Sequence, residues 1–401
     1  KEIPGMKGAE KEKALSEMKK FSGELKDLEE KLRSSEEEWK AMHLLLPNLP
    51  HARVPVGKTD QENKEVKKWG DPSTPLGVTP PSKLKDHVFL GEALDILDFQ
   101  RGVKVAGTRG YFLKGDGARL QQAVLRFTLD HLLKKGWTLF SPPLLATYDC
   151  FVGTGFFPGA GQLNIYTVGG QEEVGGPMKN DNLYLIGTSE VSVCSYHKDE
   201  VLEHSMLPTR YAGISSCFRR EAGTYGKDAK GLYRIHHFEK VEQVVLCEAD
   251  ESKALAMFEE IRTNAEEVLQ ALELPYRVVD VCTGDMGQGK VYMQDIETWM
   301  PSRKAYCETH SCSYLGDFQA RRLNIRYASV LAAGFSPQTR TKTEFVHTLN
   351  NTCIASPRIL IPILEMYQNA DGSVTVPEAL RPYMNGQEKI EKHVTLSSSN
   401  G

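Results

Sequence analysis

Two strand-like runs and the loop between them make up residues 211–247, YAGISSCFRREAGTYGKDAKGLYRIHHFEKVEQVVLC. Residues that favour strands gather at both ends of this segment, and Gly, Lys, Asp and Thr fill its middle. Similar runs occur at 183–188 (LYLIGT) and 276–282 (YRVVDVC). Because these strands follow one another without a regular helix between each pair, we expect an α+β fold built on an antiparallel β-sheet.

Helices are predicted on both sides of these strands. Residues 118–137 and 252–272 carry apolar side chains at helical spacing, and a shorter apolar helix is expected near 357–367. The sheet and its flanking helices are expected to form one domain at 86–385. A Pro-rich linker at 51–85 precedes it, and a tail at 386–401 that ends in LSSSNG follows it.

The first fifty residues follow a different pattern. From Met18 to Leu46 the apolar residues recur at steps of three and four, and only Ser35 interrupts the series. Such a heptad indicates a coiled-coil helix with one stripe that needs a partner. We therefore expect residues 1–50 to form a projecting helical coiled-coil arm. Its nearly balanced charge gives no reason, from composition alone, to expect RNA binding.

Composition excludes several classes of protein. The chain has 401 residues, with 49 Lys and Arg against 53 Asp and Glu, so its net charge of −4 excludes a strongly basic protein and a disordered polyelectrolyte. No apolar run approaches the ~18 residues that cross a bilayer, so no membrane span is expected. The eight cysteines form no CxxC pair, and we expect free thiols in a reducing compartment. The sequence begins at Lys1 rather than Met, for which a cleaved targeting peptide is one explanation.

Two familiar ligand-binding patterns are incomplete. GDMGQGK at 284–290 matches the start of a phosphate-binding P-loop, but Val291 stands where a Ser or Thr would bind Mg²⁺. We therefore expect an ordinary turn there. The C-x₂-H-x-C pattern at 307–312 has no known zinc-knuckle spacing, and no second cysteine pair supports a zinc site.

The segment from 218 to 242 carries side chains suited to a nucleotide. In regular strands Arg219 and Glu221 share one face, as do Arg234, Phe238 and Glu242 on the following strand. If those faces meet, one surface offers two guanidinium groups, an aromatic plane and two carboxylates. Arginine suits phosphate oxygens, Phe can stack on a purine, and carboxylates can accept from an amine. An exposed hairpin with paired charges is the alternative for such a segment in isolation.

Three further segments favour the binding interpretation. A hydroxyl and a carboxylate are added by Thr188-Ser189-Glu190, which follows an apolar strand. Residues 308–311 (ETHS) can supply oxygen ligands for Mg²⁺. Arg358 is expected to open an apolar helix, where the helix dipole also favours a terminal phosphate.

These segments resemble the motifs of class II aminoacyl-tRNA synthetases, and specifically those of seryl-tRNA synthetases. GWTLFSPP (136–143) is similar to motif 1, the 218–242 segment to motif 2, and HTLNNTCIASPRILIPILEMYQ (347–368) to motif 3. Four further stretches resemble segments that are specific to seryl-tRNA synthetases: LPNLPHARVPVG, GTSE, CTGDMG and ETHSCSYLGDFQARRLNIRY. Together with YFLKGDGARL, the resemblance extends from residue 15 to residue 385.

The resemblance implies a catalytic domain that ligates L-serine to tRNA-Ser with ATP, through a seryl-adenylate. It also implies Mg²⁺ as cofactor, a homodimer whose interface is built on motif 1, and an arm that binds tRNA-Ser. The alternative is a catalytically inactive synthetase-like RNA-binding protein. A third interpretation, an enzyme that loads an amino acid onto a carrier protein, would not need the arm helix.

Residue roles are implied by the same resemblance. The implied ATP-binding residues are Arg219, Glu221, Arg234, Ile235, Phe238, Glu308, Thr309, His310, Ser311 and Arg358. The implied serine-binding residues are Thr188, Ser189, Glu190, Arg219, Glu242, Asn350 and Thr352. Arg219 would contact the α-phosphate, Phe238 would stack on adenine, and Arg358 would meet the γ-phosphate. Glu308 and Ser311 would hold Mg²⁺, and Arg219, Arg358 and Glu308 are the implied catalytic residues.

Two features depart from the family pattern. Motif 3 usually reads LNGSGLAVGR, whereas here it reads LNNTCIASPR, with Thr352 in place of a Ser and with Asn351 and Cys353 in place of two glycines. The family's arm is an antiparallel helical hairpin, and only one helix can be read here. In these two features the sequence is most similar to an animal mitochondrial form of seryl-tRNA synthetase. We therefore expect the mitochondrial matrix, with the cytoplasm as the alternative.

Overall fold

In the computed structural model the chain divides into two units, Lys1–Pro47 and Asn48–Gly401. The structure describes residues 8–74, 76–77, 79, 83–169, 180–223, 230–328 and 342–392. The Gly- and Lys-containing loop at 224–229 and the end of the tail from 393 onward lie outside the described residues.

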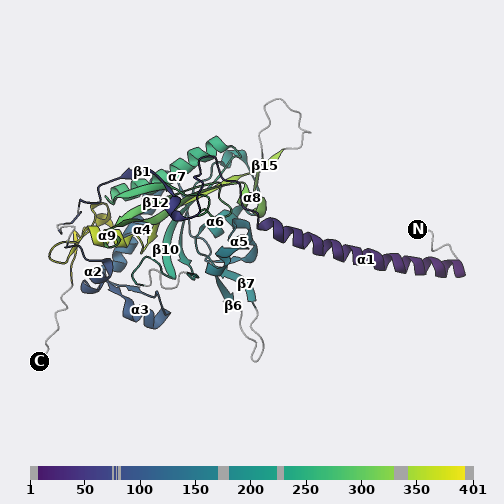
Figure 1. Ribbon diagram of the computed structural model, residues 1–401, viewed down its shortest axis with the longest axis horizontal. Helices are drawn as coiled ribbons and strands as arrows, with labels where there is room; N and C mark the ends of the chain where they lie inside the picture. Colours follow the sequence, from purple (N-terminus) through teal and green to yellow (C-terminus); the bar gives the residue numbers. More distant parts are fainter. Residues whose placement is uncertain are drawn as a thin grey trace. The chain divides into compact units, whose positions relative to one another are not determined.

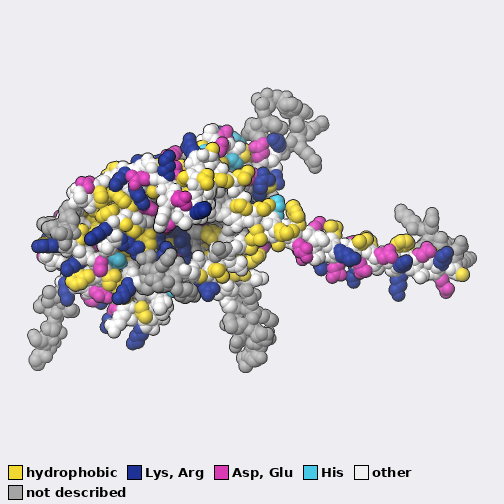
Figure 2. All heavy atoms as spheres, in the orientation of Figure 1, with side chains coloured by type: hydrophobic (Ala, Val, Ile, Leu, Met, Phe, Trp, Pro, Cys, Tyr) yellow, Lys and Arg dark blue, Asp and Glu magenta, His cyan; other side chains and the backbone are white. Residues whose placement is uncertain are grey.

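The described part of the N-terminal unit is dominated by one helix, α1 (Ala9–Leu44). Its 36 residues extend ~54 Å at 1.5 Å per residue. Figure 2 shows hydrophobic side chains along this helix beside acidic and basic ones. The apolar stripe is between 48% and 66% exposed, at Leu15, Met18, Phe21, Leu25, Leu28, Leu32, Trp39 and Met42. The predicted helix is present, and coiled-coil pairing of its stripe stays a prediction.

Eight strands form the main sheet of the second unit, in the order β1-β11-β12-β13-β16-β10-β9-β4 (Figure 1). Every neighbouring pair is antiparallel except β4 and β9. The α+β fold with a large antiparallel sheet is therefore confirmed. In sheet order the strands are Lys64–Trp69, Tyr276–Asp280, Tyr292–Met300, Ala305–Gly316, His347–Ser356, His237–Cys247, Tyr211–Phe218 and Thr138–Phe140.

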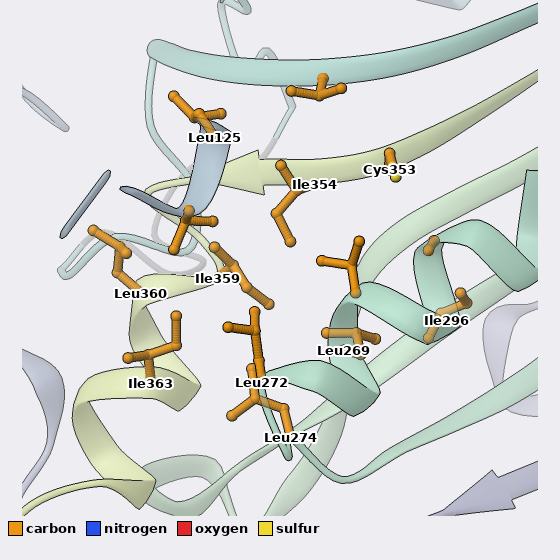
Figure 3. Packing of buried hydrophobic residues seen from close by; sticks show 14 of the residues in the cluster. Leu125, Leu269, Leu272, Leu274, Ile296, Cys353, Ile354, Ile359, Leu360 and Ile363 are labelled. Atoms are coloured by element: carbon orange, nitrogen blue, oxygen red, sulfur yellow. The ribbon is translucent and has the colours of Figure 1, made fainter. Parts of the chain in front are cut away.

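Three helices pack on this sheet and build the core: α4 (Asp116–Lys134), α7 (Glu251–Ala271) and α9 (Leu360–Met366). The helices predicted at 118–137 and 252–272 correspond to α4 and α7. Asp250 caps α7, because its carboxylate accepts from the backbone N–H of Lys253 at 3.0 Å. Figure 3 shows where side chains from all three helices meet apolar side chains of β12 and β16.

Shorter elements surround this core. The remaining helices are α2 (His87–Ala93), α3 (Phe99–Ala106), α5 (Tyr148–Thr154), α6 (Glu190–Cys194) and α8 (Phe318–Leu323). Small sheets pair β5 (Leu145–Thr147), β7 (Asn180–Leu185) and β6 (Tyr166–Gly169), and also β15 (Thr343–Phe345), β14 (Arg326–Ala328) and β8 (Val201–Leu202). Two-stranded pairs join β2 (Leu97–Asp98) to β3 (Phe112–Leu113) and β17 (Val374–Thr375) to β18 (Lys389–Ile390).

Three element boundaries differ from the sequence expectation. Strand β10 begins at His237 rather than at Tyr233, because the carbonyls of Tyr233 and Arg234 accept from arginine side chains instead of from a neighbouring strand. Strand β9 ends at Phe218, so Arg219 and Glu221 lie beyond it. Helix α9 starts at Leu360, after a turn in which the Leu360 N–H donates to the Pro357 carbonyl at 2.9 Å. Arg358 therefore lies in that turn and does not open the helix.

All eight cysteines carry free thiols. Within the described ranges, each helix is too short or too polar to cross a bilayer.

Candidate active site

One cavity is lined by residues of β10, β13 and β16, by the segments just after β9 and just before β10, and by the start of α6 and the turn before α9. Thirteen of the residues proposed from the sequence line it: Thr188, Glu190, Arg219, Glu221, Ile235, Phe238, Glu242, Glu308, Thr309, Ser311, Asn350, Thr352 and Arg358. Seven others line it as well: Phe156, Leu232, Tyr233, Lys240, Lys290, Ala355 and Ser356. Segments far apart in the sequence thus contribute to one site.

Arg219 and Phe238 form a flat, cationic part of this cavity. The Arg219 guanidinium lies 5.2 Å from the centroid of the Phe238 ring. Its Nε donates to the Gly187 carbonyl at 3.2 Å, and its backbone N–H donates to the His236 carbonyl at 2.9 Å. The guanidinium is therefore fixed beside an aromatic face, an arrangement suited to a phosphate next to a planar base.

Arg358 forms a second cationic part. Its Nε donates to the Tyr233 carbonyl at 3.1 Å, and its Nη1 donates to the Glu308 carbonyl at 3.1 Å. The Tyr233 ring lies between cations, with Arg358 at 4.4 Å and Arg303 at 4.0 Å from its centroid. Burial raises the pKa of the Tyr233 hydroxyl to about 12, so this ring stays uncharged near neutral pH.

Carboxylates gather at the other end of the cavity. The Glu242 carboxylate pairs with the Lys240 ammonium, and both side chains are at least 95% buried. The Thr352 hydroxyl donates to Glu242 Oε2 at 3.2 Å. Glu190 accepts from the Gln319 amide at 2.7 Å. Burial, with Glu242 nearby, raises the pKa of Glu190, and the Lys290 ammonium opposes that rise.

Oxygen atoms line the cavity along β13. The Glu308 carboxylate and the Ser311 hydroxyl both belong to the lining, and Asp295 lies directly opposite Ser311 in the strand register. Burial raises the pKa of Asp295 well above its ordinary range, and Glu308 raises it further. No group of three or more His, Cys, Asp or Glu side chains is arranged to hold a metal ion in the described ranges. Magnesium is usually held by one or two protein oxygens plus substrate phosphates and water, so Glu308 and Ser311 fit that ion in the presence of a nucleotide.

Three residues proposed from the sequence lie outside the cavity lining. Ser189 is fully buried, and its hydroxyl donates to the Gly213 carbonyl at 3.3 Å. His310 is 1% exposed and does not belong to the lining; its Nδ1 lies 2.8 Å from the Thr309 hydroxyl, and burial lowers the pKa of its imidazole to about 3. Arg234 precedes β10 and pairs with the Glu221 carboxylate at 3.4 Å. The prediction that Arg234 shares the face of Phe238 is wrong, because Arg234 lies before β10 and not in a regular strand.

Two cavity lysines were missed. Lys240 shares a face with Phe238 and Glu242, and the two-residue period of a strand was sufficient to include it. Lys290 ends the GDMGQGK segment, and its ammonium donates to the Ser313 hydroxyl. Lys290 was not proposed as a site residue because the segment does not complete a P-loop, but a lysine that follows a turn can line a binding site without one.

The motif 3 substitutions fall on both faces of β16. Asn350 and Thr352 line the cavity. Asn351 is fully buried, and its amide donates to the Ile261 carbonyl of α7 at 2.6 Å. Cys353 is also fully buried and belongs to the apolar core (Figure 3). Two of the three substitutions therefore belong to helix packing, and Thr352 alone reaches the cavity.

Comparison with known proteins gives matches over most of the chain. The family description tRNA synthetase class II core domain (G, H, P, S and T) matches residues 172–367. The serine--tRNA ligase of Deinococcus radiodurans is 47% identical over 380 residues, which are 94% of this chain and 83% of that protein. That of Trichlorobacter lovleyi is 44% identical, over 94% of this chain and 84% of that protein.

Two solved structures match the fold closely. The seryl-tRNA synthetase of Pyrococcus horikoshii, complexed with ATP, gives a TM-score of 0.81 at 35% identity, over 95% of this chain and 83% of that chain. The cytoplasmic serine-tRNA ligase of Naegleria fowleri, in complex with AMP, gives a TM-score of 0.79 at 34% identity, over 92% of this chain and 82% of that chain.

Proposed function

The chain belongs to the seryl-tRNA synthetases of class II, and from that membership we propose that it joins L-serine to tRNA-Ser at the expense of ATP, through a seryl-adenylate. One observation carries the proposal. A single cavity combines a guanidinium beside an aromatic plane at one end with buried carboxylates and a hydroxyl at the other. The first end suits a nucleotide and the second suits a small hydroxylated ammonium compound.

The reaction needs positioning and charge stabilisation rather than a protein nucleophile. In the first step a serine carboxylate oxygen attacks the α-phosphorus of ATP in line, the bond to the β,γ-phosphates breaks, and pyrophosphate leaves. In the second step a ribose hydroxyl at the tRNA end attacks the adenylate carbonyl carbon, and AMP leaves. Arg219 stabilises the negative charge that develops on the α-phosphate in the first step.

The nucleotide is assigned to the end with Arg219, Phe238 and Arg358. Phe238 stacks on adenine, Glu221 accepts from its amino group, and Ile235 packs beside it. Arg358, held by two backbone carbonyls, faces the γ-phosphate. These roles are the ones that the resemblance to the family implies, and they are supported by the presence of all these residues in the lining of one cavity.

Serine is assigned to the carboxylate end. Glu190 and Glu242 attract the ammonium group, and Thr352 with Glu242 offers partners to the substrate hydroxyl. Asn350 and Thr188 complete the lining. Alanine would leave these buried polar groups without partners, so its rejection needs no separate editing step.

Magnesium is proposed as the cofactor, held by Glu308 and Ser311 together with ATP phosphates. A divalent cation bound there would neutralise phosphate charge. The protein residues around it supply two oxygens and the fixed backbone that positions Arg358.

A homodimer and an RNA-binding arm complete the proposal. Strand β4 is the edge of the main sheet, and exposed apolar side chains lie on it and just beyond, at Leu139, Leu144 and Leu145. Such an edge favours burial against a second copy. The arm α1 carries both charge types and an apolar stripe, and we propose that it contacts tRNA-Ser outside the cavity.

We further propose an animal mitochondrial form that acts in the mitochondrial matrix. The motif 3 sequence LNNTCIASPR supports this proposal. Imaging of the full-length protein carrying a C-terminal fluorescent tag tests it, since a uniform cytoplasmic signal would contradict it.

Serine-dependent ATP–pyrophosphate exchange tests the catalytic proposal, with threonine, alanine and glycine as controls. Exchange that depends on serine is expected. No exchange with any amino acid, from folded protein with Mg²⁺ present, would favour the inactive RNA-binding alternative. The curated serine--tRNA ligases at 44–47% identity weigh against that alternative.

A further inference from the structure

His87 is a buried histidine at the start of α2, and it does not line the cavity. Its side chain is 10% exposed. The preceding residue, Asp86, fixes the start of the helix, since its carboxylate accepts from the Phe89 N–H at 2.7 Å. Helix α2 lies beside α9 (Figure 1). The His87 imidazole therefore lies at the contact between α2 and α9, the helix that follows the turn with Arg358.

The hydrogen-bond partners of His87 fix where its proton sits. Nε2 faces the backbone N–H of Leu232 at 3.2 Å, and a backbone amide can only donate. Nε2 must therefore accept through its lone pair, so the ring is neutral and its proton is on Nδ1. Nδ1 lies 2.8 Å from Glu365 Oε1, an acceptor for that proton. The His87 backbone N–H donates to the same oxygen at 3.1 Å.

Gly231 allows this close approach. Its φ is +83°, a left-handed conformation that side chains other than glycine adopt at a cost. A Cβ at this position would lie 2.4 Å from His87 Nε2, well inside van der Waals contact. The glycine therefore brings the backbone of Leu232 against the imidazole.

The segment held by His87 frames the Arg358 end of the cavity. Leu232 and Tyr233 line the cavity, and the Tyr233 carbonyl accepts from Arg358. The other carboxylate oxygen of Glu365 accepts from the Ser302 N–H at 2.9 Å. Ser302 is next to Arg303, whose guanidinium lies over the Tyr233 ring. One imidazole and one buried carboxylate thus link α2, α9, the turn at 301–303 and the segment before β10.

We propose that His87, as the neutral Nδ1–H tautomer, is a positioning residue for ATP, which sets the backbone of Leu232 and Tyr233 and through it the guanidinium of Arg358. The inference rests on the proposed function, because it assigns the Arg358 end to phosphates. His87 touches neither substrate. Its loss should weaken use of ATP and leave use of serine unchanged, since the hydrogen bonds that run from His87 through Leu232 and Tyr233 reach the Arg358 end of the cavity.

Two substitutions separate the two sides of the ring. An Asn side chain places its amide near the Nδ1 position, so His87→Asn keeps a donor to Glu365 and leaves the Leu232 N–H unpaired. A Gln side chain reaches the Nε2 position, so His87→Gln keeps an acceptor for Leu232. In exchange assays His87→Asn should raise the KM for ATP about tenfold, with the KM for serine within about twofold of wild type, and His87→Gln should stay near wild type for both.

His197 provides a matched control. It is 4% exposed, bonds through both ring nitrogens to Glu200 and Tyr211, and lies outside the cavity. His197→Asn and His197→Gln should reduce thermal stability without changing the KM for ATP selectively. An equal effect of His87→Asn on ATP and serine, or no effect on either, would overturn the positioning role.

A measurement on the wild-type protein guards against variants that do not fold. Long-range ¹⁵N NMR of histidine-labelled protein, assigned with His87→Gln, should show Nδ1 protonated and Nε2 unprotonated at neutral pH. A proton on Nε2 would overturn the proposal. Wild-type protein that shows this tautomer and yet no exchange would refute the proposed catalytic function instead, so the two failures are distinguishable.

Discussion

Replacing Lys240 by Met should destabilise the protein strongly, because it leaves a buried carboxylate without its partner. The Lys240 and Glu242 side chains are 5% and 2% exposed, and they pair directly. Removing one member of a buried ion pair costs about 3–5 kcal/mol, since the remaining charge cannot regain water. Methionine has a similar volume to lysine, so little of this loss would come from a cavity.

Urea titration of the free energy of unfolding measures the effect. The double variant Lys240→Met/Glu242→Gln should recover much of the loss, because neither charge remains. Lys198→Met is the matched control, since Lys198 faces Asp149 at 3.5 Å on the surface, where an exposed pair contributes less than about 1 kcal/mol. A loss below about 1 kcal/mol for Lys240→Met, or a double variant as unstable as the sum of its single variants, would refute the reasoning.

Three further predictions follow from the cavity and the arm. Arg219→Ala should abolish serine-dependent pyrophosphate exchange and leave the melting temperature nearly unchanged, and an unchanged exchange rate would contradict its assignment to the α-phosphate. Burial raises the pKa of the Glu190 carboxyl above its ordinary value of 4.5. As the pH rises above 4.5, the unfolded chain therefore loses the Glu190 proton before the folded protein does. The protonated carboxyl thus contributes to folding stability at low pH, and that contribution is lost as the pH rises. Glu190→Gln should therefore gain thermal stability relative to wild type from pH 4.5 to pH 8, and a difference independent of pH, in melting curves across this range, would contradict the argument. Deletion of residues 1–46 should weaken tRNA charging far more than serine-dependent exchange, and an equal loss in both assays would contradict the separation of arm and cavity.

The long helices and the antiparallel sheet were predicted correctly from the sequence. The apolar spacing in α4 and α7 and the run of strands without intervening helices were sufficient for the α+β fold. Element ends were read less well, because they depend on tertiary partners. The segment from Tyr233 to His236 has strand-like composition, but it does not join the sheet. The Tyr233 carbonyl accepts from Arg358 and the Arg234 carbonyl accepts from Arg109, so neither pairs with a neighbouring strand. Arg358 was likewise placed at a helix start, whereas the turn at Pro357 delays α9 to Leu360.

The residues that line the cavity were predictable where motifs carried them, whereas the packing partners of their neighbours were not. Arg219, Phe238, Glu242 and Arg358 line one cavity as expected. Asn350 and Thr352 were assigned to the serine pocket without Asn351 between them, and only those two line the cavity; what the sequence could not show is that the Asn351 amide bonds to the Ile261 carbonyl of α7. The register between β10 and β16 shifts at Cys353, which has no partner in β10, and such a bulge cannot be read from the two-residue period of a regular strand.

The claim that one cavity holds the nucleotide at Phe238 and serine at Glu242 is tested most directly by a crystal structure with a sulfamoyl analogue of seryl-adenylate. The adenine ring is predicted to stack on Phe238, the sulfamoyl group to lie beside Arg219, and the seryl ammonium and hydroxyl to contact Glu242 and Thr352. An analogue bound with its adenine at the carboxylate end, or bound outside this cavity, would contradict the assignment.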